Sequence, residues 1–175
     1  MAAQMDFMRR AIDLARHAVD TGSGGPFGCV IVKDGVIVAE GFNQVRATQD
    51  PTAHGEMVGL RAAAAALGTA DLSGCEIYNI SVPCPMCLAA LYWAKIDKVF
   101  YCCLPEDADA AGYDNVTIAR HLQKPIEAQP IRSERIEALY DDALAVYRHA
   151  VAMRRTAANA LSPPPPIVGD ATIPT

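Results

Sequence analysis

The stretch Pro51-Thr-Ala-His-Gly-Glu56 and the stretch Val82-Pro-Cys-Pro-Met-Cys87 organise the rest of this sequence. The first supplies a histidine and a glutamate, and the second supplies two cysteines one helical turn apart. A histidine, two thiolates and a carboxylate that need not be a ligand are the groups of a zinc site with one open position. The sequence therefore predicts a metal centre built from these two segments.

The two cysteines lie at the start of a predicted helix. Residues three apart share one helix face, so the sulfurs of Cys84 and Cys87 point the same way, and Pro85 suits the first helical position. Alone, such a pair is equally consistent with a redox pair or a structural zinc knuckle. A structural zinc site needs a fourth protein ligand, and no other cysteine or histidine of the sequence has matching spacing.

His54 and Glu56 stand two positions apart, which places them about 200° apart on a regular helix. Both side chains can reach one site only if His54 sits at the irregular beginning of the helix. Pro51, just upstream, is consistent with such a beginning. The N–H groups of a helix N-terminus would also suit a developing oxyanion.

The predicted chemistry is hydrolysis of an amine on a carbon next to a ring C=N. Zinc held by His54, Cys84 and Cys87 would lower the pKa of water toward neutrality. Two thiolates neutralise much of the metal charge, so a carboxylate is needed to move protons, and Glu56 is the candidate catalytic residue. The alternative is a non-catalytic zinc module, against which Glu56 argues because a structural site needs no proton carrier.

The composition narrows the class of protein. The chain has 175 residues and a net charge of −5, which argues against a nucleic-acid binder because such proteins usually show a basic stripe. No apolar stretch approaches the ~20 residues of a membrane span, and the first residues lack the pattern of a signal peptide. We therefore expect a cytoplasmic protein, whose six cysteines serve metal binding or burial rather than disulfides.

Apolar periodicity and turn residues predict the order of elements. Apolar groups spaced by three or four indicate a helix over residues 5–20, and Asp34-Gly35 marks the tip of a hairpin over 27–40. The polar segment 41–52 is interpreted as a loop. The further expected elements are helices at 54–68, 85–94, 106–111, 116–122 and 137–154, and strands at 76–81, 98–103 and 131–136.

This alternation of strands and helices after an opening hairpin indicates an α/β fold. We expect a three-layer α-β-α sandwich with a mixed sheet of about five strands. Residues 1–155 are expected to form the zinc-binding domain. Residues 156–175 are Pro- and Ala-rich, with a run at Pro163–Pro166, and are predicted to form a flexible tail.

The His-x-Glu and Pro-Cys-x-x-Cys motifs resemble those of the cytidine-deaminase-like superfamily of zinc deaminases. Within it, the sequence is similar to the bacterial guanine deaminases over about residues 5–152. The segments that carry this resemblance are Gly25–Gly35, Asp50–Glu56, Pro83–Ala94 and Ala111–Asn115. The resemblance implies Zn²⁺ as cofactor, a small nucleobase as substrate and a homodimer, with no membrane or nucleic-acid partner.

The resemblance also implies substrate contacts. Asn43 would hydrogen-bond the ring edge of the base, Phe27 and Trp93 would pack against its flat face, and Asp114 would accept from an amino group. The N–H of Gly55 would line the oxygen side. The alternatives stay open at this point: a turn role for the asparagine and the aspartate, and core packing for the two aromatic residues.

Three departures from the family pattern bear on specificity. Gly55 replaces the commoner Ala, Val82 replaces the usual Glu before Pro-Cys, and Asn79-Ile80 replaces a small polar pair. In the guanine branch a C-terminal segment can cross to the partner subunit, and Tyr140–Arg155 could do so here.

The expected function is hydrolytic deamination of a free nucleobase, with guanine converted to xanthine and ammonia. Cytosine and other aminopurines or aminotriazines are the nearest rival substrates. A tRNA adenosine deaminase shares the zinc motif but needs an electropositive face for phosphates, and basic residues do not cluster around the motifs.

Overall fold

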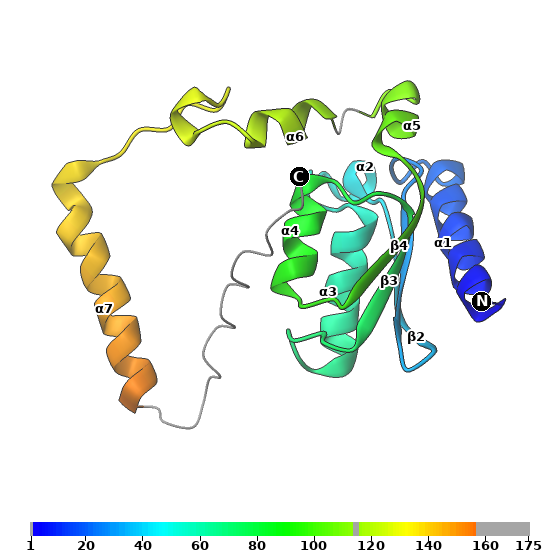
Figure 1. Ribbon diagram of the computed structural model, residues 1–175, viewed down its shortest axis with the longest axis horizontal. Coiled ribbons are helices and arrows are strands. Elements are labelled where there is room, and N and C mark those ends of the chain that lie inside the picture. Colours follow the sequence, from blue (N-terminus) through cyan, green and yellow to red (C-terminus); the bar gives the residue numbers. More distant parts are fainter. Residues whose placement is uncertain (1, 114–115, 157–175) are drawn as a thin grey trace, which may run out of the picture. The chain divides into compact units, whose positions relative to one another are not determined.

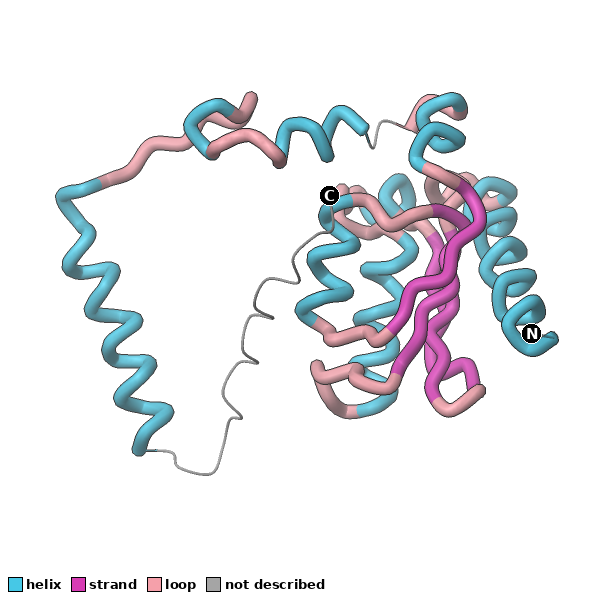
Figure 2. The backbone as a smooth tube through the Cα atoms, viewed as in Figure 1, coloured by secondary structure: helices cyan, strands magenta, loops and turns pink. Residues whose placement is uncertain are grey.

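The computed structural model describes residues 2–113 and 116–156, which fall into two units, Met1–Pro130 and Ile131–Thr175. Figure 1 shows the order of the elements, and Figure 2 shows that the strands gather in the first unit. No helix within the described ranges is both long and apolar enough to cross a membrane.

A four-stranded mixed sheet forms the centre of the first unit. Its strands are β1 (Gly28–Lys33), β2 (Val36–Phe42), β3 (Cys75–Ser81) and β4 (Lys98–Cys103), in the order β2-β1-β3-β4. Strand β1 runs antiparallel to β2 and β3, whereas β3 and β4 are parallel. The β1–β2 hairpin turns through Asp34 and Gly35, both with positive φ, as a tight turn between twisted strands requires.

Helices cover both faces of this sheet, so the three-layer α/β architecture is confirmed. Helix α1 (Ala2–Asp20) lies on one face, and helices α3 (Gly55–Leu67) and α4 (Pro85–Trp93) lie on the other (Figure 1). The parallel β3–β4 pair requires a crossover connection, and α4 provides it.

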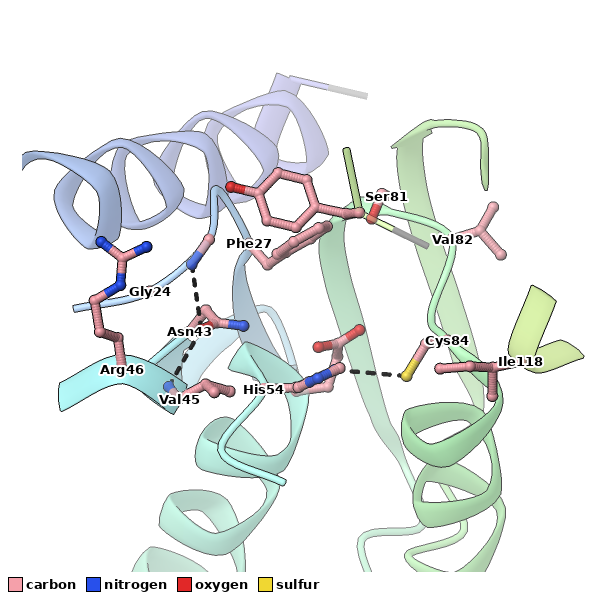
Figure 3. Close-up of a pocket in the computed structure, with 13 residues that line it drawn as sticks. Gly24, Phe27, Asn43, Val45, Arg46, His54, Ser81, Val82, Cys84 and Ile118 are labelled. Carbon is pink, nitrogen blue, oxygen red and sulfur yellow. Dashed lines mark hydrogen bonds between the residues drawn. The ribbon is translucent and has the colours of Figure 1, made fainter. Parts of the chain in front are cut away.

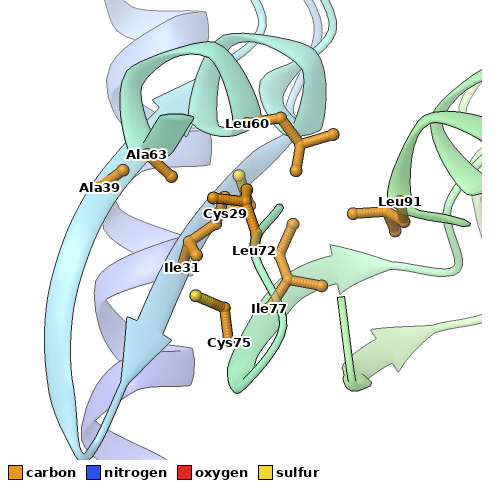
Figure 4. Close-up of a cluster of buried hydrophobic side chains, with 9 residues drawn as sticks. All are labelled: Cys29, Ile31, Ala39, Leu60, Ala63, Leu72, Cys75, Ile77 and Leu91. Carbon is orange, nitrogen blue, oxygen red and sulfur yellow. The ribbon is translucent and has the colours of Figure 1, made fainter. Parts of the chain in front are cut away.

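Two apolar clusters join the layers, because alternate residues of each strand face opposite sides of the sheet. Cys29 and Ile31 of β1 face α3 and α4, whereas Val30 and Val32 face α1. Figure 4 shows the first cluster, whose members are Cys29, Ile31, Ala39, Leu60, Ala63, Leu72, Cys75, Ile77 and Leu91.

Glycines allow the helices to approach the sheet closely. A Cβ at Gly28 would lie 2.4 Å from the carbonyl oxygen of Ala11 in α1. A Cβ at Gly41 would lie 2.1 Å from the carbonyl oxygen of Gly55 at the start of α3. Any side chain at Gly41 would therefore push away the end of α3 that carries the histidine motif.

Shorter elements complete the first unit. They are α2 (Val45–Thr48), within the segment expected to be a loop, α5 (Pro105–Ala110), α6 (Val116–Leu122) and a 3₁₀ turn at Ile126–Ala128. The second unit contains a 3₁₀ turn at Glu137–Leu139 and the long helix α7 (Tyr140–Thr156).

The expectation of a fifth strand at 131–136 is wrong. The described sheet has four strands, and this segment forms neither strand nor helix. Its two β-branched isoleucines suggested a strand, but Ile131 and Ile136 are 80% and 71% exposed, so no sheet face buries them. The predicted domain boundary after residue 155 stays a prediction.

Candidate metal centre and adjoining pocket

Two helix beginnings carry the candidate metal ligands. His54 is the N-cap of α3 and has an extended backbone (φ −65°, ψ 157°), so it stands outside the helical turn that holds Glu56. Cys84 is the N-cap of α4, also extended, and Cys87 lies in the first turn behind Pro85. The irregular helix start needed to bring His54 and Glu56 to one place is therefore present.

The three ligand atoms have the spacing of a metal site. The Nδ1 atom of His54 lies 3.5 Å from the Sγ of Cys84 and 3.5 Å from the Sγ of Cys87, and all three lie within 4.8 Å of one another. Tetrahedral zinc, with its usual bond lengths to sulfur and nitrogen, would separate such atoms by about 3.6 Å. The residues present therefore fit a zinc ion with one position left for a non-protein ligand.

The pKa values of the two cysteines are set mainly by each other. A hydrogen bond from Cys87, supported by His54, lowers the pKa of Cys84 to about 4. The same pairing, together with burial, raises the pKa of Cys87. Hydrogen bonding to Cys84 raises the pKa of His54. One thiolate is thus formed before a metal binds, and metal binding would release the proton of the second.

Glu56 is a buried carboxyl beside these ligands. Its side chain is part of the pocket lining although the residue is only 8% exposed, and burial raises its pKa above the ordinary value. Oε1 accepts a hydrogen bond from Nδ2 of Asn79 at 3.3 Å. A carboxyl whose pKa is raised toward neutrality can both accept and return a proton.

A cavity of about 360 Å³ opens over the metal ligands (Figure 3). Such a volume lies in the range of small-molecule sites. Phe27 forms part of its wall, with its ring edge-to-face against Tyr113 at a centroid distance of 5.1 Å. The complete lining comprises Gly24, Gly25, Phe27, Asn43, Val45, Arg46, His54, Glu56, Ser81, Val82, Cys84, Tyr113 and Ile118.

Asn43 is held in a fixed orientation at this cavity. Its Oδ1 accepts from the backbone N–H of Gly25 at 3.3 Å and from that of Val45 at 3.2 Å. The amide nitrogen is left to face the cavity, where it can donate to a ligand (Figure 3). A Cβ at Gly24 would lie 1.9 Å from this Oδ1, so only glycine leaves room for the asparagine.

The structure does not bring every predicted contact to the cavity. Trp93 is 81% exposed and absent from the lining, because it ends α4 about 13 Å along the axis from Cys84. The expectation that it packs against a base is not supported within the described chain. Gly55 begins α3 between two lining residues, so its N–H is among the free N–H groups of that helix. Asp114 lies outside the described residues.

Sequence reasoning missed several lining residues. Tyr113 stands in a segment that the family resemblance singled out, but its role as a partner of Phe27 depends on tertiary packing. Arg46 comes from the unpredicted helix α2. Ser81 could have been predicted to lie near the site, because it follows Asn79 on the same face of β3.

The matching family model describes the cytidine and deoxycytidylate deaminase zinc-binding region and covers residues 1–103. Guanine deaminase of Bacillus subtilis is 48% identical over 125 residues, which are 71% of this chain and 80% of that protein. A tRNA-specific adenosine deaminase of Aquifex aeolicus is 40% identical over 98 residues, which are 56% of this chain and 64% of that protein.

Solved structures give the same picture. The structure of the Bacillus subtilis guanine deaminase matches with a TM-score of 0.79 and 42% identity, over 83% of this chain and 93% of that chain. A guanine deaminase from Nitrosomonas europaea matches with a TM-score of 0.60 and 26% identity, over 83% of each chain.

Proposed function

This chain belongs to the family of the cytidine and deoxycytidylate deaminase zinc-binding region, and we propose that it hydrolyses the exocyclic amine of free guanine. Guanine and water would give xanthine and ammonia. The observation that carries the proposal is a buried carboxyl beside three zinc-spaced ligand atoms at one cavity. Similarity to the guanine deaminases supports the choice of base.

Zinc is the proposed cofactor, held by His54, Cys84 and Cys87. When bound, it supplies Lewis-acid activation of the attacking water. Glu56 would take one proton from the attacking water and pass it to the ring nitrogen next to the attacked carbon, as the C–O bond forms. It would then take the proton of the added hydroxyl and give it to the departing amine, as the C–N bond breaks. Burial raises the pKa of Glu56, which lowers the free-energy cost of its protonated form and so favours this cycling.

The other cavity residues orient the base. Phe27 offers a flat apolar wall for stacking, and Nδ2 of Asn43 donates to an acceptor on the ring edge. The N–H of Gly55 would stabilise oxygen charge as the carbon becomes tetrahedral. Asp114 is retained as the proposed acceptor for an amino group of the base.

A tRNA substrate has less support, although tRNA deaminases are among the relatives. Arg46 is the one Lys or Arg among the described residues that line the cavity, and the chain carries a net charge of −5. Phosphate binding would require clustered positive charge, and the affinity would then fall steeply with salt.

The test is ammonia release by the zinc-loaded protein from guanine, cytosine, adenine, ammeline, guanosine and cytidine. We expect release from guanine and none from the two nucleosides. Release from cytosine or ammeline alone would keep the zinc chemistry and reject guanine. Absence of release from all six, with zinc bound, would contradict the proposal and favour a structural zinc module.

The remaining parts of the proposal concern assembly and location. A homodimer is supported by large exposed apolar side chains on α4, on β4 and just after β4, namely Leu88, Tyr92, Trp93, Tyr101 and Leu104; exposed apolar surface of this kind marks protein interfaces. A cytoplasmic location is supported by the free thiols of the site, which a reducing compartment preserves.

A further inference from the structure

Asn79 occupies a position where the strand pattern calls for an apolar side chain. It follows Cys75 and Ile77 at alternate positions of β3, on the sheet face that packs against α3 and α4. Both preceding residues belong to the first core cluster and are fully buried. Asn79 itself is 2% exposed, so a primary amide has been placed at the end of an apolar row.

The amide has one polar partner within residues 2–113 and 116–156. Nδ2 of Asn79 donates to Oε1 of Glu56, whereas Oδ1 of Asn79 is buried without a hydrogen bond. A half-satisfied buried amide destabilises the fold relative to an apolar side chain of similar size. A buried polar residue in an apolar row, kept despite its loss of stability, is expected where function requires it.

The backbone of Asn79 is a rigid support. Strand β3 is an interior strand, and Asn79 pairs with Cys29 of β1 on one side and with Tyr101 of β4 on the other. Glu56 belongs to a different element, in the first turn of α3. The hydrogen bond therefore fixes the carboxyl of a flexible side chain relative to the sheet.

We infer that Asn79 is a positioning residue that holds Oε1 of Glu56, leaving Oε2 as the oxygen that exchanges protons with water and base. The inference rests on the proposed function, because it assigns Asn79 a role in the proton transfers of Glu56. Asn79 does not line the cavity, so it acts through Glu56 and not on the substrate. Its loss should affect kcat and leave guanine binding nearly unchanged.

The test is Asn79→Leu, which keeps the branched shape of the side chain and removes the hydrogen bond. We expect kcat with guanine to fall about 10- to 100-fold, the usual effect of removing a residue that orients a site. KM should stay within about twofold and zinc content should be unchanged. The melting temperature should change little, because removal of the unpartnered Oδ1 offsets the loss of the donor to Oε1 of Glu56. Asn79→Ser is a second variant, because serine is smaller than asparagine and cannot overpack the site, yet it is too short to reach Glu56.

Ile77→Val is the matched control. It shortens a fully buried side chain two positions earlier in the same row, which has no polar partner. This variant should lower the melting temperature and leave kcat unchanged. The Asn79 variants should instead lose kcat with little change in melting temperature. This difference separates a positioning role of Asn79 from a purely structural one.

A double variant completes the design. In a Glu56→Gln background, adding Asn79→Leu should leave the residual rate within about twofold, because residues that act as a unit are not additive. A folded Asn79→Leu or Asn79→Ser enzyme with wild-type kcat would overturn the inference alone. A wild-type enzyme that deaminates none of the six compounds would overturn the proposed function and this inference with it.

Discussion

At the residue scale, the site depends on which residues are inside a helix and which stand just before it. His54 and Glu56 would diverge on a regular helix. As the extended N-cap, His54 instead turns toward the cysteines, while Glu56 approaches the cavity from the first turn. The same arrangement at Cys84 lets a pair three positions apart face one point.

Glu56→Gln should lower turnover to a small residual rate and leave zinc bound. The amide keeps the shape of the side chain but cannot cycle a proton, and general acid–base catalysis contributes about 10²- to 10⁴-fold. Zinc content by elemental analysis and ammonia release measure the two effects. A variant with an unchanged rate would reject Glu56 as the proton carrier.

Asn43→Ala should weaken guanine binding. One hydrogen bond to a ligand contributes about 1 kcal/mol, so KM should rise by roughly fivefold or more, while zinc content stays the same. Thr48→Ala, an exposed change in the adjoining helix α2, is the control and should leave KM unchanged. Equal kinetics for the two variants would remove Asn43 from the substrate contacts.

At the element scale, the position of α3 against β2 decides whether the site forms. The two elements meet through Gly41 of β2 and through Gly55 and Gly59 of α3. On the other face, Arg10 of α1 makes a bidentate ion pair with Glu40 of β2, at 2.7 and 2.6 Å. Close packing at glycines therefore holds α3 on one face of the sheet, and an ion pair holds α1 on the other.

Gly41→Ala should destabilise the protein and weaken zinc binding. Its Cβ would meet backbone atoms of α3 at 2.1 and 2.6 Å, and neither can move without moving the helix. We expect a loss of about 1–3 kcal/mol in the free energy of unfolding, as for other overpacked sites. Gly55→Ala, whose Cβ comes no closer than 3.1 Å to other atoms, should lower the free energy of unfolding by less than Gly41→Ala. Thermal unfolding of the two variants measures this loss.

Glu40→Gln should remove a contribution to stability that depends on pH. The hydrogen bond from Arg10 lowers the pKa of Glu40 below its ordinary value of 4.5. The ion pair therefore stabilises the fold above pH 4.5 and loses its effect as pH falls through the lower pKa of the folded state. Both side chains are partly exposed, so the difference at pH 7 should be only about 0.5 kcal/mol.

Urea unfolding of wild type and Glu40→Gln at pH 7 and at pH 3 measures this difference. The two proteins should differ at pH 7 and converge at pH 3. Asp6→Asn is the control, because Asp6 pairs with Arg9 within α1 and joins no second element. A gap that widens toward pH 3 would contradict the assigned sign.

At the scale of the whole molecule, the first unit exposes large aromatic side chains at the end of α4 and on the edge strand β4. Tyr92 and Trp93 end α4 at 75% and 81% exposure, and Tyr101 of the edge strand β4 is half exposed. Large aromatic residues at a surface are typical of interfaces. The position of Trp93 thus suits a contact with a second copy better than a contact with the base.

Trp93→Ser should shift the protein toward monomer. If Trp93 is a central aromatic residue of the proposed interface, its removal costs about 2 kcal/mol, and the dissociation constant of the proposed dimer should rise about thirtyfold. Light scattering across a dilution series measures this shift. Val36→Ser, an equally apolar-to-polar change at the exposed hairpin tip, should leave the mass unchanged; equal behaviour of the two variants would reject this face as the interface.

The sequence by itself determined most of the helices and strands and predicted the candidate ligands, because the signals for both are local. Caps, turn residues and apolar spacing act within a few residues, so the hairpin at Asp34-Gly35 and the helices after His54 and Cys84 could be predicted. The strand expected at 131–136 was wrong, because a strand also needs a neighbouring strand to pair with, and the residues of one segment cannot supply it.

Only the tertiary structure decided what meets at the site. It brought the beginnings of α3 and α4 together, placed Asn79 behind Glu56, added Tyr113 to the wall at Phe27, and left Trp93 at the far end of its helix. These contacts join residues that are far apart in the chain. They depend on which faces of the sheet the helices cover and how closely glycines let them approach, and no local pattern encodes that.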